Sequence, residues 1–373
     1  MHDREQESQG VLTPADISAG HDWRLGRFPN LMQRRIEKIL LVSSPYDSFI
    51  LEEDGLLSEL IFSEYVDLGL THSPHVTRVS NGEEALAAIR SGDFDLVITM
   101  LRVGGMDCAS FGRAVREVSP DLPVVLLIAD ELELLRLGET LYELDVDDIY
   151  VWQGDAKLFL AIIKVIEDRR NAEHDTRIGG VGVIILVEDS LRFRSSLLPA
   201  LYSELVSQTR SVMQDGLNRM HKLLRLRARP KILTAATYED ALALYERFKD
   251  YIFGLITDVT FPRDGQPDPQ AGLALIHQIK SEHPDVPVLL QSSDPDNRKL
   301  ADSVQSAFLH KRSRTLLADL REFMLNNFGF GDFVFRLPDG TEVARARDLR
   351  SMKRVLPTVP EESLDYHGQR NHF

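Results

Sequence analysis

The sequence predicts an α/β protein made of two doubly wound (βα)5 units, each built around a five-stranded parallel sheet. Short runs rich in Val, Ile and Leu alternate with amphipathic stretches of helical length, and this alternation is typical of parallel sheets covered by helices. The same order of runs occurs twice, on either side of a polar break at NAEHDTRIGG. We therefore expect one kind of unit twice in the chain.

Five apolar runs of the first copy fit the expected strands. A break at Ser80–Gly82 separates the second strand from an amphipathic helix that carries Ala85, Leu86 and Ile89. The fifth strand precedes the helical run LFLAIIKVIEDRR. The strands are expected within 38–44 (KILLVSS), the start of 71–90, 94–101 (FDLVITML), 123–130 (PVVLLIAD) and 146–152 (VDDIYVW).

The second copy repeats this order, and laying the two copies on each other pairs their strand ends. The matching runs are 181–190 (VGVIILVEDS), 231–248, 251–262 (YIFGLITDVTFP), 286–293 (VPVLLQSS) and 306–313 (SAFLHKRS). Met100 then falls opposite Asp258, Ile128 opposite Ser292, Trp152 opposite Lys311, and Ser43–Ser44 opposite Glu188–Asp189.

Composition excludes several classes of protein. The chain of 373 residues has a formal net charge of −15, which repels phosphate backbones and argues against direct binding of nucleic acid. Its one cysteine, Cys108, permits no internal disulfide and is interpreted as a small loop residue without a redox role. No signal peptide or membrane-spanning run is visible, so we expect a cytoplasmic protein.

The chain divides into five predicted regions. The N-terminal residues are too polar to bury much apolar area, and the last residues predict a hairpin followed by helices. The regions are a disordered tail over 1–36, a first unit over 37–172, a linker over 173–180, a second unit over 181–328, and a hairpin with helices over 329–373.

Chemically active side chains gather at the strand ends of the second copy. Because parallel strands bring their carboxyl ends to one edge of a sheet, three acids, a hydroxyl and an ammonium group should converge there. Clustered carboxylates repel one another unless a cation lies among them, and an all-oxygen site with few protein ligands suits Mg²⁺. The residues are Glu188, Asp189, Asp258, Ser292 and Lys311.

These five residues resemble the phosphorylation site of the receiver domains of two-component response regulators, which are CheY-like. The resemblance covers about 181–328 and implies a flavodoxin-like receiver fold. It implies that Asp258 is the phosphoacceptor, and that Mg²⁺ is held by Glu188, Asp189, Asp258 and the backbone carbonyl of Thr260. It further implies that Ser292 and Lys311 contact the phosphoryl oxygens, and that Phe308 is the aromatic switch residue.

The first copy resembles the same family in strand order but lacks its chemistry. Ser43, Ser44, Met100, Ile128 and Trp152 occupy the five positions, so we interpret this copy as a pseudo-receiver without a metal site. Asp47 and Asp107 lie near the same edge, and we do not expect them to rebuild one.

The second copy departs from the receiver pattern in three places. Arg312 follows Lys311 where the family usually has a cis-proline. The loop after Asp258 is 6 residues longer than its counterpart in the first copy, and it is interpreted either as a cover over the phosphoryl group or as a contact for a partner. The segment 191–229 is long for a first helix, so we expect a helical arm.

Three further features of the second copy are interpreted as structural rather than functional. His310, beside Lys311, is expected to be structural rather than a phosphohistidine. The basic stretch 221–231 (HKLLRLRARPK) is expected to be the solvated end of a helix rather than a site for an anionic partner. The apolar spacing in 197–213 predicts a packing face, with a homodimer seam as the alternative.

The C-terminal segment suggests an output beyond the two units. A hairpin around Pro338–Gly340 and a basic helix resemble, more loosely, the N-terminal part of bacterial proteins that continue into a phosphoenolpyruvate-synthase-like domain. None of that enzyme's catalytic residues is present in this sequence. We therefore expect the chain to be part of a longer protein, with 329–373 linking the receivers to an output domain.

The sequence favours a regulatory module that accepts a phosphoryl group from a histidine kinase or phosphotransfer protein, and not an enzyme. The enzyme alternative is a Mg²⁺-dependent phosphatase or phosphotransferase that works through an aspartyl phosphate. The haloacid-dehalogenase type needs a second acid two residues after the nucleophile, where this chain has Thr260. A scaffold without phosphorylation is the third interpretation, and retention of all five groups in one copy argues against it.

Overall fold

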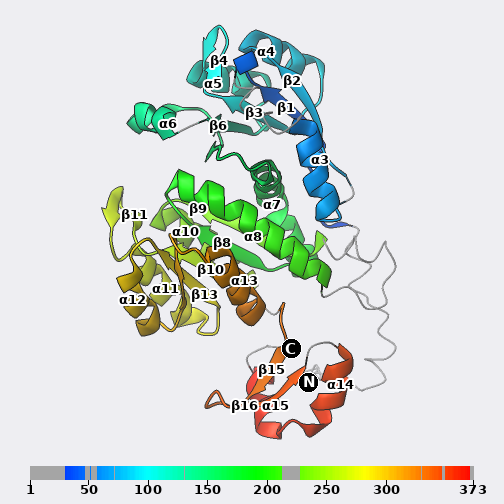
Figure 1. Cartoon of the computed structure of the whole chain (residues 1–373), viewed down its shortest axis with the longest axis vertical. Helices are drawn as coiled ribbons and strands as arrows, with labels where there is room; N and C mark the ends of the chain where they lie inside the picture. The colour runs from blue at the N-terminus through cyan, green and yellow to red at the C-terminus, as the bar shows by residue number, and fades with distance from the viewer. Residues whose placement is uncertain are drawn as a thin grey trace, which may run out of the picture.

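The computed structural model describes residues 30–46, 51, 57–70, 72–129, 131–211, 227–328, 330–346 and 349–369. Within these ranges the chain forms two α/β units and a small C-terminal unit (Figure 1). We call β1 to α7 the first unit and β8 to α13 the second unit. In the described part of the chain, no helix combines the length and apolarity needed to cross a bilayer.

The first unit is a five-stranded parallel sheet in the order β2-β1-β3-β6-β7. Its strands are β1 (Lys38–Val42), β2 (His75–Val79), β3 (Leu96–Met100), β6 (Val124–Ile128) and β7 (Asp148–Val151). A short ribbon, β4 (Arg102–Val103) with β5 (Met106–Asp107), follows β3. The helices are α3 (Leu57–Asp67), α4 (Gly82–Ser91), α5 (Cys108–Val118), α6 (Glu131–Leu137), the 3₁₀ helix η2 (Gly138–Glu143) and α7 (Lys157–Gly179).

The second unit repeats this topology in the order β14-β13-β10-β8-β9. Its strands are β8 (Val183–Val187), β9 (Lys231–Ala235), β10 (Ile252–Asp258), β13 (Val288–Ser292) and β14 (Ala307–His310), with the ribbon β11 (Phe261–Arg263) and β12 (Gln266–Asp268). The helices are α8 (Leu191–Ser211), α10 (Tyr238–Phe248), α11 (Ala271–Glu282), α12 (Arg298–Ser303) and α13 (Leu316–Asn327), with 3₁₀ turns η3 (Lys249–Tyr251) and η4 (Pro295–Asn297).

Counted along the chain, both sheets have the strand order 2-1-3-4-5, which is the flavodoxin-like form of the doubly wound fold. The predicted fold class is therefore confirmed. In this fold, ligands bind beyond the carboxyl ends of the central strands, where the strand order reverses.

Helix α7 joins the two units into one core. Every residue from 158 to 168 is buried, as expected of a helix that is apolar on almost all sides. The helix packs against α8 and β9 of the second unit, and a single apolar cluster includes residues of both sheets (Figure 1). The predicted linker at 173–180 is not a loop, because α7 continues through Gly179 and ends at Gly180 in the left-handed conformation.

The segment before β1 is also part of this core, which corrects the prediction of a tail up to residue 36. Leu31, Met32 and Ile36 are buried, and backbone N–H groups of the segment donate to side chains of α7. The donors are two residues apart along the segment, and their acceptors are four residues apart, about one turn of α7. The pairs are Met32 with Asp175 (3.2 Å), Arg34 with Asn171 (2.9 Å) and Ile36 with Glu167 (3.1 Å). Residues 1–29 of the predicted tail lie outside the described residues.

Buried ion pairs bind α7 to the second unit. Asp168 accepts two hydrogen bonds of 2.8 Å from Arg229, one from Tyr202 Oη at 2.9 Å and one from the backbone N–H of Ile232 at 2.9 Å. Lys231 Nζ lies 2.8 Å from Asp175 Oδ2, and both side chains are fully buried. The prediction of a solvated basic stretch is wrong for Arg229 and Lys231, whereas residues 221–226 lie outside the described residues.

The burial of helix α8 supports the interpretation of its apolar residues as a packing face. Leu197, Leu198, Leu201, Tyr202 and Leu205 are buried in the core shared by the two units. The apolar face over these residues is therefore covered within the chain and is not a free seam for a homodimer. The predicted helical arm beyond Ser211 falls on 212–226, outside the described residues.

The C-terminal residues form a small folded unit. The predicted hairpin is present as β15 (Phe333–Arg336) and β16 (Glu342–Ala346), followed by α14 (Leu349–Val355), the 3₁₀ turn η5 (Leu356–Thr358) and α15 (Glu361–Gln369). Phe335, Ala346 and Val359 form its core. His367 Nε2 accepts a 2.8 Å hydrogen bond from the backbone N–H of Arg336, which ties the last helix to the hairpin.

Candidate functional site

Four strand ends of the second unit bring the predicted groups to one edge of its sheet. Glu188 and Asp189 follow β8, Asp258 ends β10, Ser292 ends β13, and Lys311 follows β14. The strands are buried apolar runs in parallel register, so their last residues are carried to the same level. The arrangement of these strand ends follows directly from the sequence pattern.

Lys311 lies at the centre of the site. Its Nζ is 2.5 Å from Asp258 Oδ2, and 2.8 Å and 2.6 Å from the two carboxylate oxygens of Glu188. The lysine side chain is 7% exposed, Asp258 14% and Glu188 0%. The ring of Phe193, in the first turn of α8, lies 4.5 Å from Nζ, so the ammonium also has a cation–π partner.

The three carboxylates fit a divalent cation. Oxygens of Glu188, Asp189 and Asp258 lie within 4.8 Å of one another. Burial, followed by the neighbouring charge of Asp258, raises the pKa of Asp189, and burial raises the pKa of Glu188 to about 7 against the opposing effect of Lys311. One ammonium leaves three acids undercompensated, and an all-oxygen donor set is the one Mg²⁺ prefers.

Ser292 and Phe308 are close to the site but have other contacts. Ser292 Oγ accepts hydrogen bonds from the backbone N–H of Asp294 at 3.1 Å and from Asn297 Nδ2 at 2.8 Å, in the loop after its strand. Phe308 is half-buried, and the Arg298 guanidinium lies 5.1 Å from its ring centre. Thr260 is exposed, two residues beyond Asp258.

Sequence reasoning missed Gln291, which is fully buried at the penultimate position of β13. Its Nε2 donates to Glu188 Oε2 at 2.8 Å, and Gln291 pairs in register with Asp258 on the neighbouring strand. A glutamine inside the apolar run VPVLLQSS was the available signal, because buried polar side chains need a partner. Gln291 therefore holds the most buried acid of the site.

The longer loop after Asp258 forms the β11–β12 hairpin. Asp264 and Gly265 have positive φ angles of 51° and 71°, as a tight two-residue hairpin turn requires. The hairpin lies against α10, where the Arg263 guanidinium is 4.4 Å from the ring centre of Tyr238 and the Asp264 N–H donates to Glu239 at 2.9 Å. These contacts hold it beside the site.

A close approach between two backbone segments fixes the loop on its other side. A Cβ on Gly272 would lie 2.1 Å from the carbonyl oxygen of Asp258, and the Gly272 N–H donates to Val259 O at 3.0 Å. Only glycine fits there. The Val259 N–H in turn donates to Asp258 Oδ1 at 2.7 Å, which leaves Oδ2 to Lys311.

Among the residues that the structure describes, the corresponding edge of the first unit carries no such cluster. Ser43, Met100 and Ile128 are buried at its strand ends, and Trp152 follows β7. Asp107 caps α5 by accepting from the Ser110 N–H and hydroxyl, and Asp47 is outside the described residues. Among the described residues, three acids close enough to share a metal ion occur at Glu188, Asp189 and Asp258 alone.

His310 and Cys108 both have structural contacts, although Cys108 begins helix α5 and is not the loop residue that the sequence predicted. His310 Nε2 lies 3.1 Å from the carbonyl oxygen of Ser293, within its own sheet edge. Cys108 is buried at the start of α5, and this burial raises the pKa of its thiol to about 11. Neither side chain contacts the carboxylate cluster.

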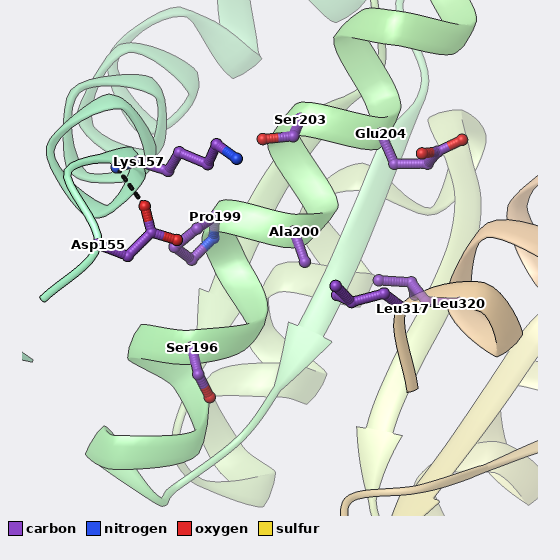
Figure 2. Close-up of a pocket in the computed structure, with 9 residues that line it drawn as sticks. All are labelled: Asp155, Lys157, Ser196, Pro199, Ala200, Ser203, Glu204, Leu317 and Leu320. Carbon is purple, nitrogen blue, oxygen red and sulfur yellow. Dashed lines mark hydrogen bonds between the residues drawn. The ribbon is translucent and has the colours of Figure 1, made fainter. Parts of the chain in front are cut away.

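A cavity of about 270 Å³ lies between the start of α7, α8 and α13 (Figure 2). Lys157, Pro199 and Leu317 are among the residues that line it, and Figure 2 shows the Lys157 side chain extending toward Ser203. It shares no lining residue with the carboxylate cluster, so the cluster is a separate site.

Comparisons with known proteins find similarity among solved structures alone. No family model and no curated protein matches the chain. The response regulator TrrA of Thermotoga maritima, in complex with Mg²⁺ and BeF, is 22% identical, with a TM-score of 0.27, over 35% of this chain and 99% of its own.

Two other similar structures are the chemotaxis response regulator CheY4 of Vibrio cholerae and the receiver domain of a sensor histidine kinase of Pseudomonas aeruginosa with a magnesium ion in its active-site cleft. They are 18% and 20% identical, with TM-scores of 0.26 and 0.27, over 35% of this chain and 98% and 97% of theirs. Each match spans a receiver-sized part of the chain, and at these scores it does not bear on function.

Proposed function

We propose that the second unit is a phosphorylation-controlled receiver, that Asp258 accepts the phosphoryl group, and that the chain serves two-component signal transduction. The observation that carries this proposal is the contact of 2.5 Å between Lys311 Nζ and Asp258 Oδ2 within a cluster of three acids. A strand-end aspartate in contact with a buried ammonium, within a group of three acids that suits a metal, is what aspartyl phosphorylation needs.

The residues of the site divide the chemistry among them. Glu188, Asp189 and Asp258 would hold Mg²⁺, with the carbonyl of Thr260 as a further ligand. Bound Mg²⁺ supplies positive charge to the transferring phosphoryl oxygens. A carboxylate oxygen of Asp258 forms the new bond to phosphorus, while the bond from phosphorus to the donor nitrogen breaks and the nitrogen keeps its electron pair. Lys311, released from Asp258, then pairs with the phosphoryl group.

Phosphorylation would change the charge at the end of β10 by about −1. Ser292 Oγ now accepts hydrogen bonds from Asp294 and Asn297. After phosphorylation it would instead donate a hydrogen bond to the phosphoryl group. Phe308 would then turn inward as Ser292 moves. The donor would be a histidine kinase or a phosphotransfer protein, and the C-terminal unit would pass the signal to an output domain.

The test is phosphorylation by acetyl phosphate, read by intact mass, on the wild type and on Asp258→Asn. The proposal predicts uptake of one phosphoryl group that needs Mg²⁺ and disappears in the variant. Continuous release of phosphate from many esters would instead support the phosphatase, and absence of uptake in the wild type would support a scaffold.

A further inference from the structure

The first turn of α8 connects the candidate site to the first unit. Helix α8 begins at Leu191, two residues after Asp189, so the loop that carries both metal-binding acids runs directly into this turn. Any element that fixes the turn also fixes the position of that loop.

Residues of the first unit bind the start of α8 at three residues, Arg192, Arg194 and Ser195. Gln153 Nε2 donates to the carbonyl oxygen of Arg192 at 2.9 Å, and the backbone N–H of Val151 donates to Ser195 Oγ at 2.9 Å. The Arg194 guanidinium donates to Asp148 Oδ1 at 2.7 Å and to the carbonyl oxygen of Ile149 at 3.1 Å. Strand β7 and the residues that follow it thus hold the start of α8.

Phe193 lies between the bonded residues and reaches the site. Its ring is 4.5 Å from Lys311 Nζ, and Lys311 contacts both Asp258 and Glu188. A continuous chain of contacts therefore runs from Asp148 and Gln153, through the α8 turn, to the carboxylate that the proposed function phosphorylates.

The Asp148–Arg194 pair is built to be rigid. The Asp148 and Arg194 side chains are 6% and 8% exposed, and Asp148 also accepts from Tyr150 Oη at 2.9 Å. The Arg194 guanidinium lies 5.6 Å from the ring centre of Tyr150. Because a buried carboxylate with several fixed donors has few alternative arrangements, it is a firm anchor for the turn.

We propose that the first unit, although it lacks the chemistry of a receiver, positions the phosphorylation site of the second unit through Asp148 and Gln153. Asp148 and Gln153 are positioning residues. They hold the first turn of α8, which fixes the loop that carries Glu188 and Asp189, and this turn includes Phe193, which contacts Lys311. This inference rests on the proposed function of the second unit. The first unit is thereby a required part of the site and not a spare copy.

The chain offers matched variants to test it. Asp148→Asn and Gln153→Ala weaken the hold on α8, whereas Arg169→Ala removes the other arginine of Asp148, whose Nη2 lies 3.0 Å from Oδ2, without touching α8. Phe193→Leu removes the cation–π contact with Lys311, whereas the separate variant Phe193→Tyr keeps an aromatic ring at this position. Denaturation midpoints identify any variant that does not fold.

The measurement is Mg²⁺ affinity of the full chain by calorimetry, with Mg²⁺ alone as the probe. Because partners outside the ligand shell commonly change metal affinity by about 10-fold or more, we expect Kd to rise about 3-fold to 10-fold in Asp148→Asn, Gln153→Ala and Phe193→Leu. Arg169→Ala and Phe193→Tyr should stay near the wild type. Fluorescence of Trp152, which directly precedes Gln153, gives a second measure of Mg²⁺ binding. The other tryptophan is removed by Trp23→Phe, so that the signal comes from Trp152 alone.

Wild-type affinity in folded Gln153→Ala and Phe193→Leu would overturn the inference while leaving the proposed function intact. A wild-type chain that binds no Mg²⁺ would overturn both. A drop in affinity shared equally by Arg169→Ala would also count against it, since that variant leaves the contacts to α8 in place.

Discussion

Lys311 Nζ lies 2.5 Å from Asp258 Oδ2 and 2.6 Å from Glu188 Oε2, so one buried ammonium balances two of the three acids at the edge of the second sheet. The third acid, Asp189, has its pKa raised by burial and by Asp258. This imbalance makes the site dependent on a cation, and the predictions below follow from it.

Lys311→Met should make the folded chain dependent on Mg²⁺. Breaking a buried ion pair on one side costs about 3–5 kcal/mol, so the free energy of unfolding without metal should fall by about that amount near pH 8. Added Mg²⁺ should restore a large part of it, as urea titrations with and without the ion would measure. Lys249→Met, which removes a lysine from exposed pairs with Glu246 and Glu282, is the control and should change little. Equal loss in both variants would contradict the account.

Mg²⁺ affinity should rise with pH up to about 7 and then level off. Burial raises the pKa of Glu188 from 4.5 to about 7, and the ion must displace the proton from this carboxyl group. Without metal, the free energy of unfolding changes with pH in the opposite direction to the Mg²⁺ affinity. The folded chain holds the proton more tightly than the unfolded chain, so the contribution of Glu188 falls as pH rises from about 4.5 to about 7. Calorimetry across this range should show both trends, and Glu188→Gln should remove them. A pH-independent affinity would speak against this assignment.

Gln291→Leu should move the pH profile upward. Gln291 donates at 2.8 Å to the charged form of Glu188, and loss of a donor to a carboxylate raises its pKa. A hydrogen bond to a charged group contributes about 1.5 kcal/mol, so the pH of half-maximal affinity should rise by about one unit. Leu290→Met, the preceding position of β13, controls for packing and should leave the profile in place. A shift to lower pH in Gln291→Leu is the result that the geometry does not allow.

Asp168→Asn should weaken the union of the two units. It leaves the Arg229 guanidinium buried with a weakened partner, and such losses cost about 3–5 kcal/mol. Arg247→Ala removes an exposed pair with Glu173 that also joins α7 to the second unit, and it should cost less than about 1 kcal/mol. Urea unfolding followed by circular dichroism compares the two. Similar small losses in both variants would mean that the buried pair is not what binds the units.

The elements that sequence predicted best are those whose signal is local. Each strand is a short apolar run, and the acids at the ends of β8 and β10 directly adjoin their strands, so the sequence alone predicts the places of Glu188 and Asp258. Because the order of strands and helices occurs twice, the two copies could be aligned. Met100 then falls opposite Asp258, which distinguishes the copy without the acid from the copy that has it.

The elements that sequence could not predict depend on distant partners. The sequence predicted a linker at 173–180 because the partners of its polar residues are distant, as Met32 lies 143 residues from Asp175. The partner of Asp168, Arg229, is likewise 61 residues away. Arg229 and Lys231 read as solvated because nothing near them in sequence is acidic. Phe193 had no visible role until α8 placed it over Lys311.

The central claim is that Asp258 receives the phosphoryl group, and peptide mass spectrometry after borohydride reduction tests it most directly. Borohydride converts an aspartyl phosphate to homoserine, which marks the modified residue. The chain is incubated with acetyl phosphate and Mg²⁺, reduced and digested. We predict homoserine at position 258, and none when Mg²⁺ is withheld. Homoserine at another aspartate with position 258 unmodified, or no homoserine at all, would contradict the account.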